Sequence, residues 1–324
     1  MRRLFEQPVA RVGVNLRPRR GSWGGANQWT SQITRWFEYH RWGVRFDLSD
    51  RVDAILMTHT GLSKDTSFGV DEVEAFKRRN PGVPCIHRIN DNDIRKNSGE
   101  MDAFLARSNR VADHTVFVSE WLRDYHAERW FDRSRPHSVI IPGADPRYFH
   151  PVGAVRWDGR SPLVFVTHHW SDNWNKGFDV YRDMDELFAG SLRGKFELWV
   201  VGRWPGEIIW KAARTFPPAS GRELATILRG AHAYVSASRF EPGAMHVAEG
   251  LQCGLPLLYH PDSGGTVGQG RAYGMEIGGG LKESVEAFAA RWAEFRQRVL
   301  ADPPSGSRMA ASYFHLVQRL VADA

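Results

Sequence analysis

The sequence predicts an α/β protein with parallel sheets that are covered by helices on both faces. Short apolar runs typical of buried strands alternate with segments of helical periodicity along the whole chain. This alternation is the pattern of repeated strand–helix–strand units. The chain has 324 residues with 42% hydrophobic content, which suffices for two domains, each with a core of its own.

The first half of the chain contains five expected strands and four expected helices. Ligands of parallel sheets bind at the carboxyl ends of the strands, and His59, His87 and Ser119 fall at such ends. The expected strands cover residues 9–16, 53–59, 83–88, 114–119 and 139–141, and the expected helices cover residues 28–40, 70–79, 91–109 and 120–129.

A proline-rich link follows the fifth strand and separates two sets of elements. Residues 139–151 read as a strand that runs into this link, and residues 162–167 begin a second series of strands and helices. The last expected helix covers residues 308–321. There is no internal repeat and no low-complexity segment, so the sequence indicates two domains and not an array.

Residues 238–256 combine a loop, a short helix and a strand. A Pro-Gly pair ends regular structure just after Glu241, and a helix is expected from Met245 to Cys253. Gly254 and Pro256 then stop the helix and lead into an extended run.

Two glutamates flank the start of this helix. Glu249 lies within the helix, and its side chain leans toward the helix N-terminus and thus toward the loop that carries Glu241. Amides without a helical partner and the positive end of the helix dipole lie between the carboxylates. Such a site suits a ligand with hydroxyls at both ends and a phosphate between, as in a nucleotide-sugar. The same sequence is also compatible with one glutamate that is exposed to solvent and one that caps the helix, without a ligand site. The amides are those of Gly243, Ala244 and Met245.

The Glu-x7-Glu pattern, followed by Gly-Leu-Gln-Cys-Gly-Leu-Pro, resembles the signature of retaining glycosyltransferases of family four, also called glycosyl transferases group 1. The resemblance implies the GT-B fold, in which two Rossmann-like, doubly wound domains face a central cleft. Residues 1–150 would form the acceptor domain and residues 151–306 the nucleotide-sugar domain. A final helix within residues 307–324 would pack back on the first domain. Gly243 stands one position earlier than in the family pattern, and His246 stands where the family varies.

The same resemblance assigns the donor-binding residues. Lys176, in an Asn-Lys-Gly loop, would hold the diphosphate, although a solvated loop lysine gives the same pattern. The family usually has an arginine at the end of the preceding strand, where this chain has Thr167-His168-His169, so either a histidine substitutes or the contact is missing. The expected donor-binding residues are Lys176, Glu249, Gly243, Ala244, Met245, His246, Gly24, Gly25, His168 and Arg203.

In the first domain the resemblance points to a glycine loop and to one strand end. Gly24 and Gly25 lie between an expected strand and helix, a geometry that brings backbone close to a phosphate or sugar. His87 matches a family histidine that reaches the donor sugar or the acceptor, and Arg88 beside it suits an anionic acceptor. We expect Glu241 and His87 to be catalytic and Arg88 and Asn27 to bind the acceptor.

We expect no metal and no cofactor besides the donor substrate. His168 and His169 are adjacent on an extended chain, so they point to opposite sides and rarely bind one ion together with Asp172. Asp91-Asn92-Asp93 resembles the cation motif of another glycosyltransferase fold, but it is better interpreted as a helix N-cap region.

The formal charge of +6 rests mainly on arginine, which favours acidic partners such as a nucleotide diphosphate, a phospholipid surface or nucleic acid. We expect a nucleotide-sugar donor, a glycan or lipid-linked acceptor and no nucleic acid.

No long apolar run follows the N-terminus, and Cys85 and Cys253 are expected to be buried thiols, which predicts a cytoplasmic protein, with peripheral contact at the inner membrane face as an option. A sugar-nucleotide epimerase and a non-enzymatic basic binding protein remain as alternatives. The sugar, base and linkage are not predictable.

Overall fold

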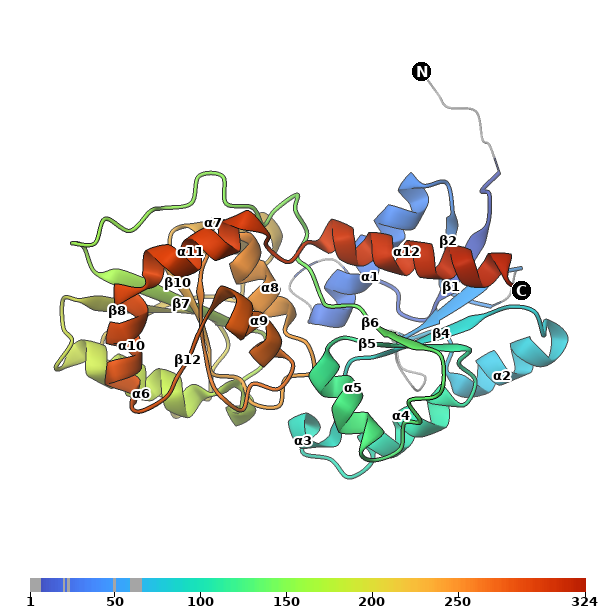
Figure 1. The fold of residues 1–324 in the computed structure, drawn as a ribbon, viewed down its shortest axis with the longest axis horizontal. Helices are drawn as coiled ribbons and strands as arrows, with labels where there is room; N and C mark the ends of the chain where they lie inside the picture. Colours follow the sequence, from blue (N-terminus) through green and yellow to red (C-terminus); the bar gives the residue numbers. More distant parts are fainter. Residues whose placement is uncertain (1–6, 20, 22–23, 49–50, 59–65) are drawn as a thin grey trace, which may run out of the picture. The chain divides into compact units, whose positions relative to one another are not determined.

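The computed structural model describes residues 7–19, 21, 24–48, 51–58 and 66–324 (Figure 1). Contacts divide them into two compact units. Unit 1 comprises residues 25–141 and 307–324 with the described residues up to position 19, and unit 2 comprises residues 142–306 with Gly21 and Gly24. Each unit has a six-stranded sheet in which neighbouring strands are parallel. This confirms the α/β class that the alternating pattern predicts.

The central strands of unit 1 are buried on both faces, which explains why they read as continuous apolar runs. Their register places Met57, His87 and Thr115 side by side. The strand order is β2-β1-β3-β4-β5-β6. The strands are β1 (Arg11–Val14), β2 (Gly43–Arg45), β3 (Ala54–Met57), β4 (Cys85–Ile89), β5 (His114–Phe117) and β6 (His137–Val139).

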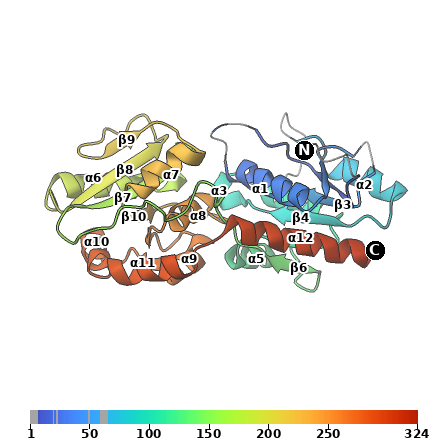
Figure 2. The ribbon, with the colours of Figure 1, turned by 90° about the horizontal axis from the view of Figure 1, so that it is seen from above.

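The last helix of the chain packs within unit 1, alongside the first helix (Figure 2). Aromatic side chains join these two helices, with ring centroids 5.3 Å apart for Trp29 and Tyr313 and 5.1 Å apart for Phe37 and Phe314. The helices of unit 1 are α1 (Gly25–Tyr39), α2 (Val70–Arg79), α3 (Asp93–Lys96), α4 (Met101–Asn109), α5 (Glu120–Ala127) and α12 (Gly306–Ala322).

The segment of residues 91–109, expected to be largely helical, is two helices with a turn between them. α3 ends at Asn97, which adopts a left-handed φ of 50°. The Asp93 carboxylate accepts hydrogen bonds from the Met101 N–H and the Ser98 hydroxyl, both at 2.7 Å. These bonds fold the chain back before α4, so a local polar network overrides the helical periodicity.

Unit 2 repeats the same architecture with the strand order β12-β11-β10-β7-β8-β9. No helix in the described part of the chain is both long and apolar enough to cross a membrane. The strands are β7 (Leu163–His169), β8 (Phe196–Gly202), β9 (Arg214–Phe216), β10 (Ala233–Ser236), β11 (Leu257–Tyr259) and β12 (Gly274–Glu276). The helices are η1 (Trp174–Lys176), α6 (Phe178–Ala189), α7 (Gly221–Arg229), α8 (Met245–Gln252), α9 (Thr266–Tyr273), α10 (Leu281–Ala290) and α11 (Trp292–Ala301).

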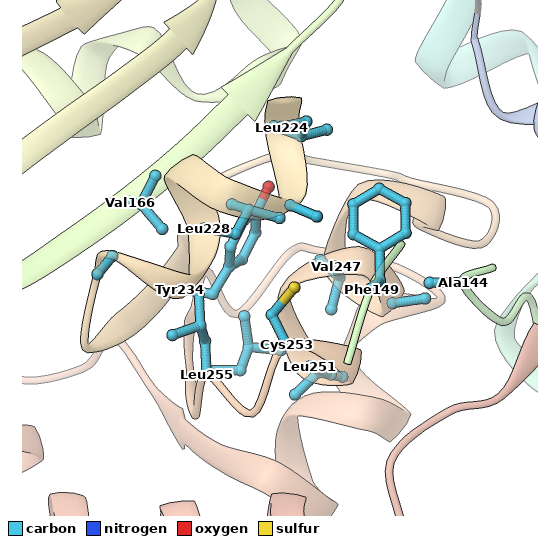
Figure 3. Packing of buried hydrophobic residues seen from close by; sticks show 14 of the residues in the cluster. Ala144, Phe149, Val166, Leu224, Leu228, Tyr234, Val247, Leu251, Cys253 and Leu255 are labelled. Carbon is cyan, nitrogen blue, oxygen red and sulfur yellow. The ribbon is translucent and has the colours of Figure 1, made fainter. Parts of the chain in front are cut away.

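α8 packs closely on β10 because Gly250 faces the ring of Tyr234, where a Cβ atom would overlap the ring. Figure 3 shows Tyr234 among Val247, Leu251 and Cys253 in the core of unit 2. This packing fixes α8, and with it Glu249, against the carboxyl end of the sheet.

Both cysteines are buried and unpaired, as the sequence predicts. Burial raises the pKa of Cys85 and the pKa of Cys253 to about 12, so neither thiol is a reactive thiolate near neutral pH.

Candidate active site

The loop before α8 is held by backbone hydrogen bonds to the loop after β11. The Phe240 N–H donates to the Asp262 carbonyl and the Gly265 N–H donates to the Glu241 carbonyl, both at 2.8 Å. Phe240 has a φ of 54°, in the left-handed region that non-glycine residues rarely adopt. Conformations of this kind persist where the surroundings enforce them, and they cluster at ligand-binding sites.

Glu241 forms a buried ion pair with Lys176. The Lys176 Nζ lies 2.7 Å from Glu241 Oε2, and the side chains are 14% and 9% exposed, respectively. Glu241, in the loop before α8, therefore has a cationic partner. Lys176 is not the solvated loop residue that its sequence context also allowed.

Gly177 explains how Lys176 reaches this position. Its φ is 85°, and a Cβ atom there would overlap the carbonyl of Ala237 at the end of β10. Only glycine allows this close approach, so the Lys-Gly pair brings the ammonium group next to the loop that carries Glu241.

Glu249 is held by a chain of hydrogen bonds that starts at Tyr234. The His168 backbone N–H donates to the Tyr234 hydroxyl at 3.3 Å, and the hydroxyl lies 3.0 Å from His168 Nδ1. The Glu249 carboxylate can only accept, so His168 Nε2 carries a proton and donates to Glu249 Oε2 at 2.8 Å. In this tautomer Nδ1 accepts from the Tyr234 hydroxyl.

These contacts bear on two expectations from the sequence, the direction of the Glu249 side chain and phosphate binding by His168. The sequence predicts that Glu249 points toward the loop of Glu241, whereas the structure gives each carboxylate its own partner. Both ring nitrogens of His168 are engaged, so direct phosphate binding by His168 would require one of its hydrogen bonds to break.

Other expected donor-binding residues of unit 2 surround these pairs. Gly243 and Ala244 precede α8, Met245 begins it, and the His246 Nε2 lies 3.3 Å from the Ser236 hydroxyl. Arg203 follows β8 and is exposed, with its guanidinium 4.3 Å from the centroid of the Trp170 ring. Within the described residues no group of three or more His, Cys, Asp or Glu side chains is arranged to hold a metal ion.

His87 is fully buried on β4 and is neutral. Burial lowers its pKa to about 3, with a smaller effect from His126. The Asn109 amide Nδ2 lies 3.3 Å from His87 Nδ1, and because that amide nitrogen is a donor, Nδ1 accepts and the ring proton is on Nε2. No described residue forms a hydrogen bond with this Nε2.

Arg88, the next residue on β4, is also buried. Its Nη1 donates to the Thr58 hydroxyl at 3.1 Å, and its guanidinium lies 4.8 Å from the centroid of the Trp29 ring.

The remaining expected residues come from the first half of the chain, and Asn27 and Ser119 among them have local structural contacts. The side chain of Asn27 accepts from the backbone N–H of Arg19 at 2.6 Å and donates to its carbonyl at 3.0 Å, so Asn27 holds Arg19 against the first turn of α1. Gly25 is the first residue of α1, and a Cβ atom on Gly24 would meet open space. Ser119 caps α5 by accepting from the Leu122 N–H at 3.1 Å, and His59 lies outside the described residues.

Three hydroxyls near the Glu241 loop were not predicted from the sequence. Ser238, Ser263 and Thr266 are fully buried, and their hydroxyl oxygens form no hydrogen bond with described residues. An isolated serine or threonine has no pattern in the sequence that marks it as functional. These three can be recognised only in the structure, where the Gly265–Glu241 hydrogen bond brings their segments together.

No protein-family model and no curated protein matches the sequence. Solved structures match almost the whole chain. Anabaena HepE in complex with UDP has a TM-score of 0.68 at 11% identity, covering 96% of this chain and 100% of that chain. A sucrose-phosphate synthase from Thermosynechococcus elongatus has a TM-score of 0.65 at 17% identity, covering 98% and 100%. The chain has the GT-B fold. WaaG, a glycosyltransferase involved in lipopolysaccharide biosynthesis, has a TM-score of 0.63 at 11% identity, covering 95% and 99%.

The GT-B fold is the one implied by the resemblance of residues 241–256 to the family signature, and this part of the prediction is confirmed. Within this fold, unit 2 carries the two buried carboxylates with their cationic and imidazole partners, and unit 1 carries His87 and Arg88.

Proposed function

We propose that this protein is a glycosyltransferase that moves a sugar, with retention, from a nucleotide-diphosphate sugar to a hydroxyl of a glycan or lipid-linked acceptor. The observation that carries the proposal is the pair of buried carboxylates around the start of α8, Glu241 with Lys176 and Glu249 with His168. Carboxylates are rarely buried unless they are paired, and two on one short segment favour a ligand site.

The start of α8 and Lys176 would bind the diphosphate. The first amides of a helix lack partners in a preceding turn and carry the positive end of the helix dipole. Lys176 lies nearby in its ion pair with Glu241, and its ammonium group would be shared between this carboxylate and the diphosphate. Protein groups alone would then balance the diphosphate charge, which is why we propose donor binding without a divalent ion.

The two carboxylates would take the ends of the donor. His168 holds Oε2 of Glu249, and Oε1 would accept hydrogen bonds from the ribose hydroxyls. Glu241 would orient the transferred sugar. The buried hydroxyls of Ser238, Ser263 and Thr266 support a polar ligand here, because buried polar groups normally have partners.

In the proposed reaction, the bond between the anomeric carbon and the diphosphate oxygen breaks, and the electron pair stays on that oxygen. The acceptor hydroxyl oxygen bonds to the same face of the anomeric carbon, and its proton passes to the departing phosphate. Lys176 and the α8 amides would stabilise the negative charge that develops on the diphosphate. His87, neutral with its proton on Nε2, would act as a hydrogen-bond donor and not as a base.

The test is product analysis with a panel of nucleotide-sugars and hydroxyl acceptors. We expect a new glycoside whose anomeric configuration, measured by NMR, equals that of the donor. An inverted glycoside would contradict retention. Formation of an isomeric nucleotide-sugar or free sugar would indicate an epimerase, and nucleic-acid binding that falls steeply with salt, without any sugar product, would indicate a basic binding protein.

A further inference from the structure

We propose that the acceptor is an anion and that Arg88 of unit 1 binds its phosphate or carboxylate group. The identification of the ligand as an acceptor rests on the proposed function. The anion site itself rests on the surroundings of Arg88.

Arg88 is a buried charge without an acidic partner. The residue is 4% exposed, and among the described residues its guanidinium donates a hydrogen bond to the neutral Thr58 hydroxyl. Within the described residues no Asp or Glu lies at ion-pair distance from it. Arginine is almost never buried unless it is paired, because removing an uncompensated charge from water is costly.

The groups around Arg88 are neutral, and several of their polar atoms have no hydrogen-bond partner among the described residues. The Nε of Arg88 and the indole Nε1 of Trp29 form no hydrogen bond with described residues, and neither does the hydroxyl of Tyr313. The Tyr313 hydroxyl lies beside the guanidinium and the Trp29 indole, and its interaction with Arg88 opposes the burial that lowers the pKa of Arg88, although none of these contacts has full hydrogen-bond geometry. A buried positive charge that faces neutral groups and keeps unused N–H donors suits an anion.

The position of Arg88 in the sheet agrees with a ligand site. It lies next to the last residue of β4, and Thr58 follows β3, so both are at the carboxyl edge where parallel sheets bind ligands. The Trp29 ring fixes the plane of the guanidinium by a cation–π contact. An oriented guanidinium matches a phosphate or a carboxylate with two parallel hydrogen bonds.

The competing explanation is a structural one, in which Arg88 joins α1 and α12 to the sheet through Trp29 and Tyr313. The two explanations differ in what Arg88→Met does. A structural arginine loses stability in every buffer when it is replaced. If Arg88 binds an anion, replacing it removes an unpaired buried charge. The stability measured without anions is then kept or increased, and stabilisation by added anions disappears.

The first experiment measures melting temperatures during a titration with inorganic phosphate, against sodium chloride of equal ionic strength. The variants are wild type, Arg88→Met and Arg129→Met. Arg129 is the matched control because it also stacks on an aromatic ring, Tyr125 at 3.7 Å, but has Glu128 and Asp102 within 4.0 Å. We expect phosphate to stabilise wild type and Arg129→Met more than Arg88→Met. Equal responses of all three, or none, would overturn the anion site.

The second experiment identifies the anion and separates this inference from the proposed function. Glucose 6-phosphate, glucuronic acid and glucose are compared as acceptors, with donor hydrolysis and nucleoside diphosphate binding measured in parallel. We expect kcat/KM for the phosphate or the carboxylate to exceed that for glucose by about 10- to 100-fold, and Arg88→Met to remove the preference. Intact donor binding without any preference, or with a preference that survives Arg88→Met, would overturn the inference. A chain that binds no nucleoside diphosphate would instead contradict the proposed function, while the phosphate response would still report on Arg88.

Discussion

The two units of the molecule treat buried charge in opposite ways. In unit 2 the buried carboxylates of Glu241 and Glu249 have Lys176 and His168 as partners. In unit 1 the buried guanidinium of Arg88 has a neutral hydroxyl and an aromatic ring. A paired charge is stable before any ligand arrives, whereas an unpaired one is stabilised by the ligand itself. This difference fits our two proposals, a preformed donor site in unit 2 and an anion site in unit 1 that is completed by its ligand.

The largest expected effect is that of Lys176→Ala. It leaves Glu241 as a buried carboxylate without its cation, which should cost about 3–5 kcal/mol of stability. It should also remove about 3 kcal/mol of transition-state stabilisation, seen as a fall in kcat/KM of roughly a hundredfold. Thermal unfolding and steady-state kinetics measure the two effects.

The double variant Lys176→Ala with Glu241→Gln is the control for this prediction. Neutralising the carboxylate should restore most of the stability but none of the activity. If Lys176→Ala alone leaves both stability and turnover unchanged, Lys176 is an ordinary loop residue.

The second prediction separates the two glutamates of unit 2. Glu249→Gln should weaken nucleoside diphosphate binding about tenfold, because its contact with ribose is made equally in the ground and transition states. Glu241→Gln should lower kcat more than nucleotide affinity, since sugar orientation matters most as the anomeric bond breaks. Calorimetric titration and transfer assays on both variants test this. The opposite pattern would contradict the assignment.

The third prediction concerns pH and the buried, neutral imidazole of His87 in unit 1. Its pKa is lowered to about 3 by burial, while an unfolded histidine titrates near 6.5. Between these two pKa values the unfolded chain binds a proton at His87 that the folded chain does not bind. The free energy of unfolding therefore falls as the pH decreases, by about 1.4 kcal/mol per pH unit.

His87→Gln should therefore reduce the slope of unfolding free energy against pH in this range by the amount that corresponds to one proton. His114→Gln is the comparison, because the pKa of His114 is lowered only to about 4 and its window is narrower. Denaturant unfolding at several pH values provides the measurement, and an unchanged slope for His87→Gln would contradict the buried neutral imidazole.

The smallest effect is expected for Tyr234→Phe. The variant keeps the ring that packs on Gly250 but removes the hydroxyl that donates to His168. Losing one hydrogen bond of about 1 kcal/mol should raise the nucleoside diphosphate dissociation constant about fivefold, with kcat nearly unchanged. An effect on kcat alone would show that the chain from Tyr234 to Glu249 does not position the ribose contact.

The sequence predicts the elements of the fold well because buried parallel strands and amphipathic helices have strong local patterns. α2 was predicted at its observed ends, Val70–Arg79, and the GT-B fold followed from the signature around Glu241. The break at Asn97 is not predicted, since it depends on hydrogen bonds that the Asp93 carboxylate accepts from residues later in the chain.

For the site, the sequence indicated residues but not their partners. The pairing of Lys176 with Glu241 joins segments 65 positions apart, and that of His168 with Glu249 joins segments 81 positions apart. Neither is visible in a local pattern. That no described Asp or Glu pairs with Arg88 is likewise a property of the packed interior and not of its neighbours in sequence.

The most direct test of the central claim is a thermal-shift panel of nucleoside diphosphates in the presence of a chelator. We predict that at least one of them stabilises the protein by about 2.7 kcal/mol at a hundred times its dissociation constant. The same compound should stabilise Glu249→Gln much less at the same concentration. No stabilisation by any of them, or stabilisation that appears only with magnesium or manganese, would contradict a donor site built from Lys176, Glu249 and the start of α8.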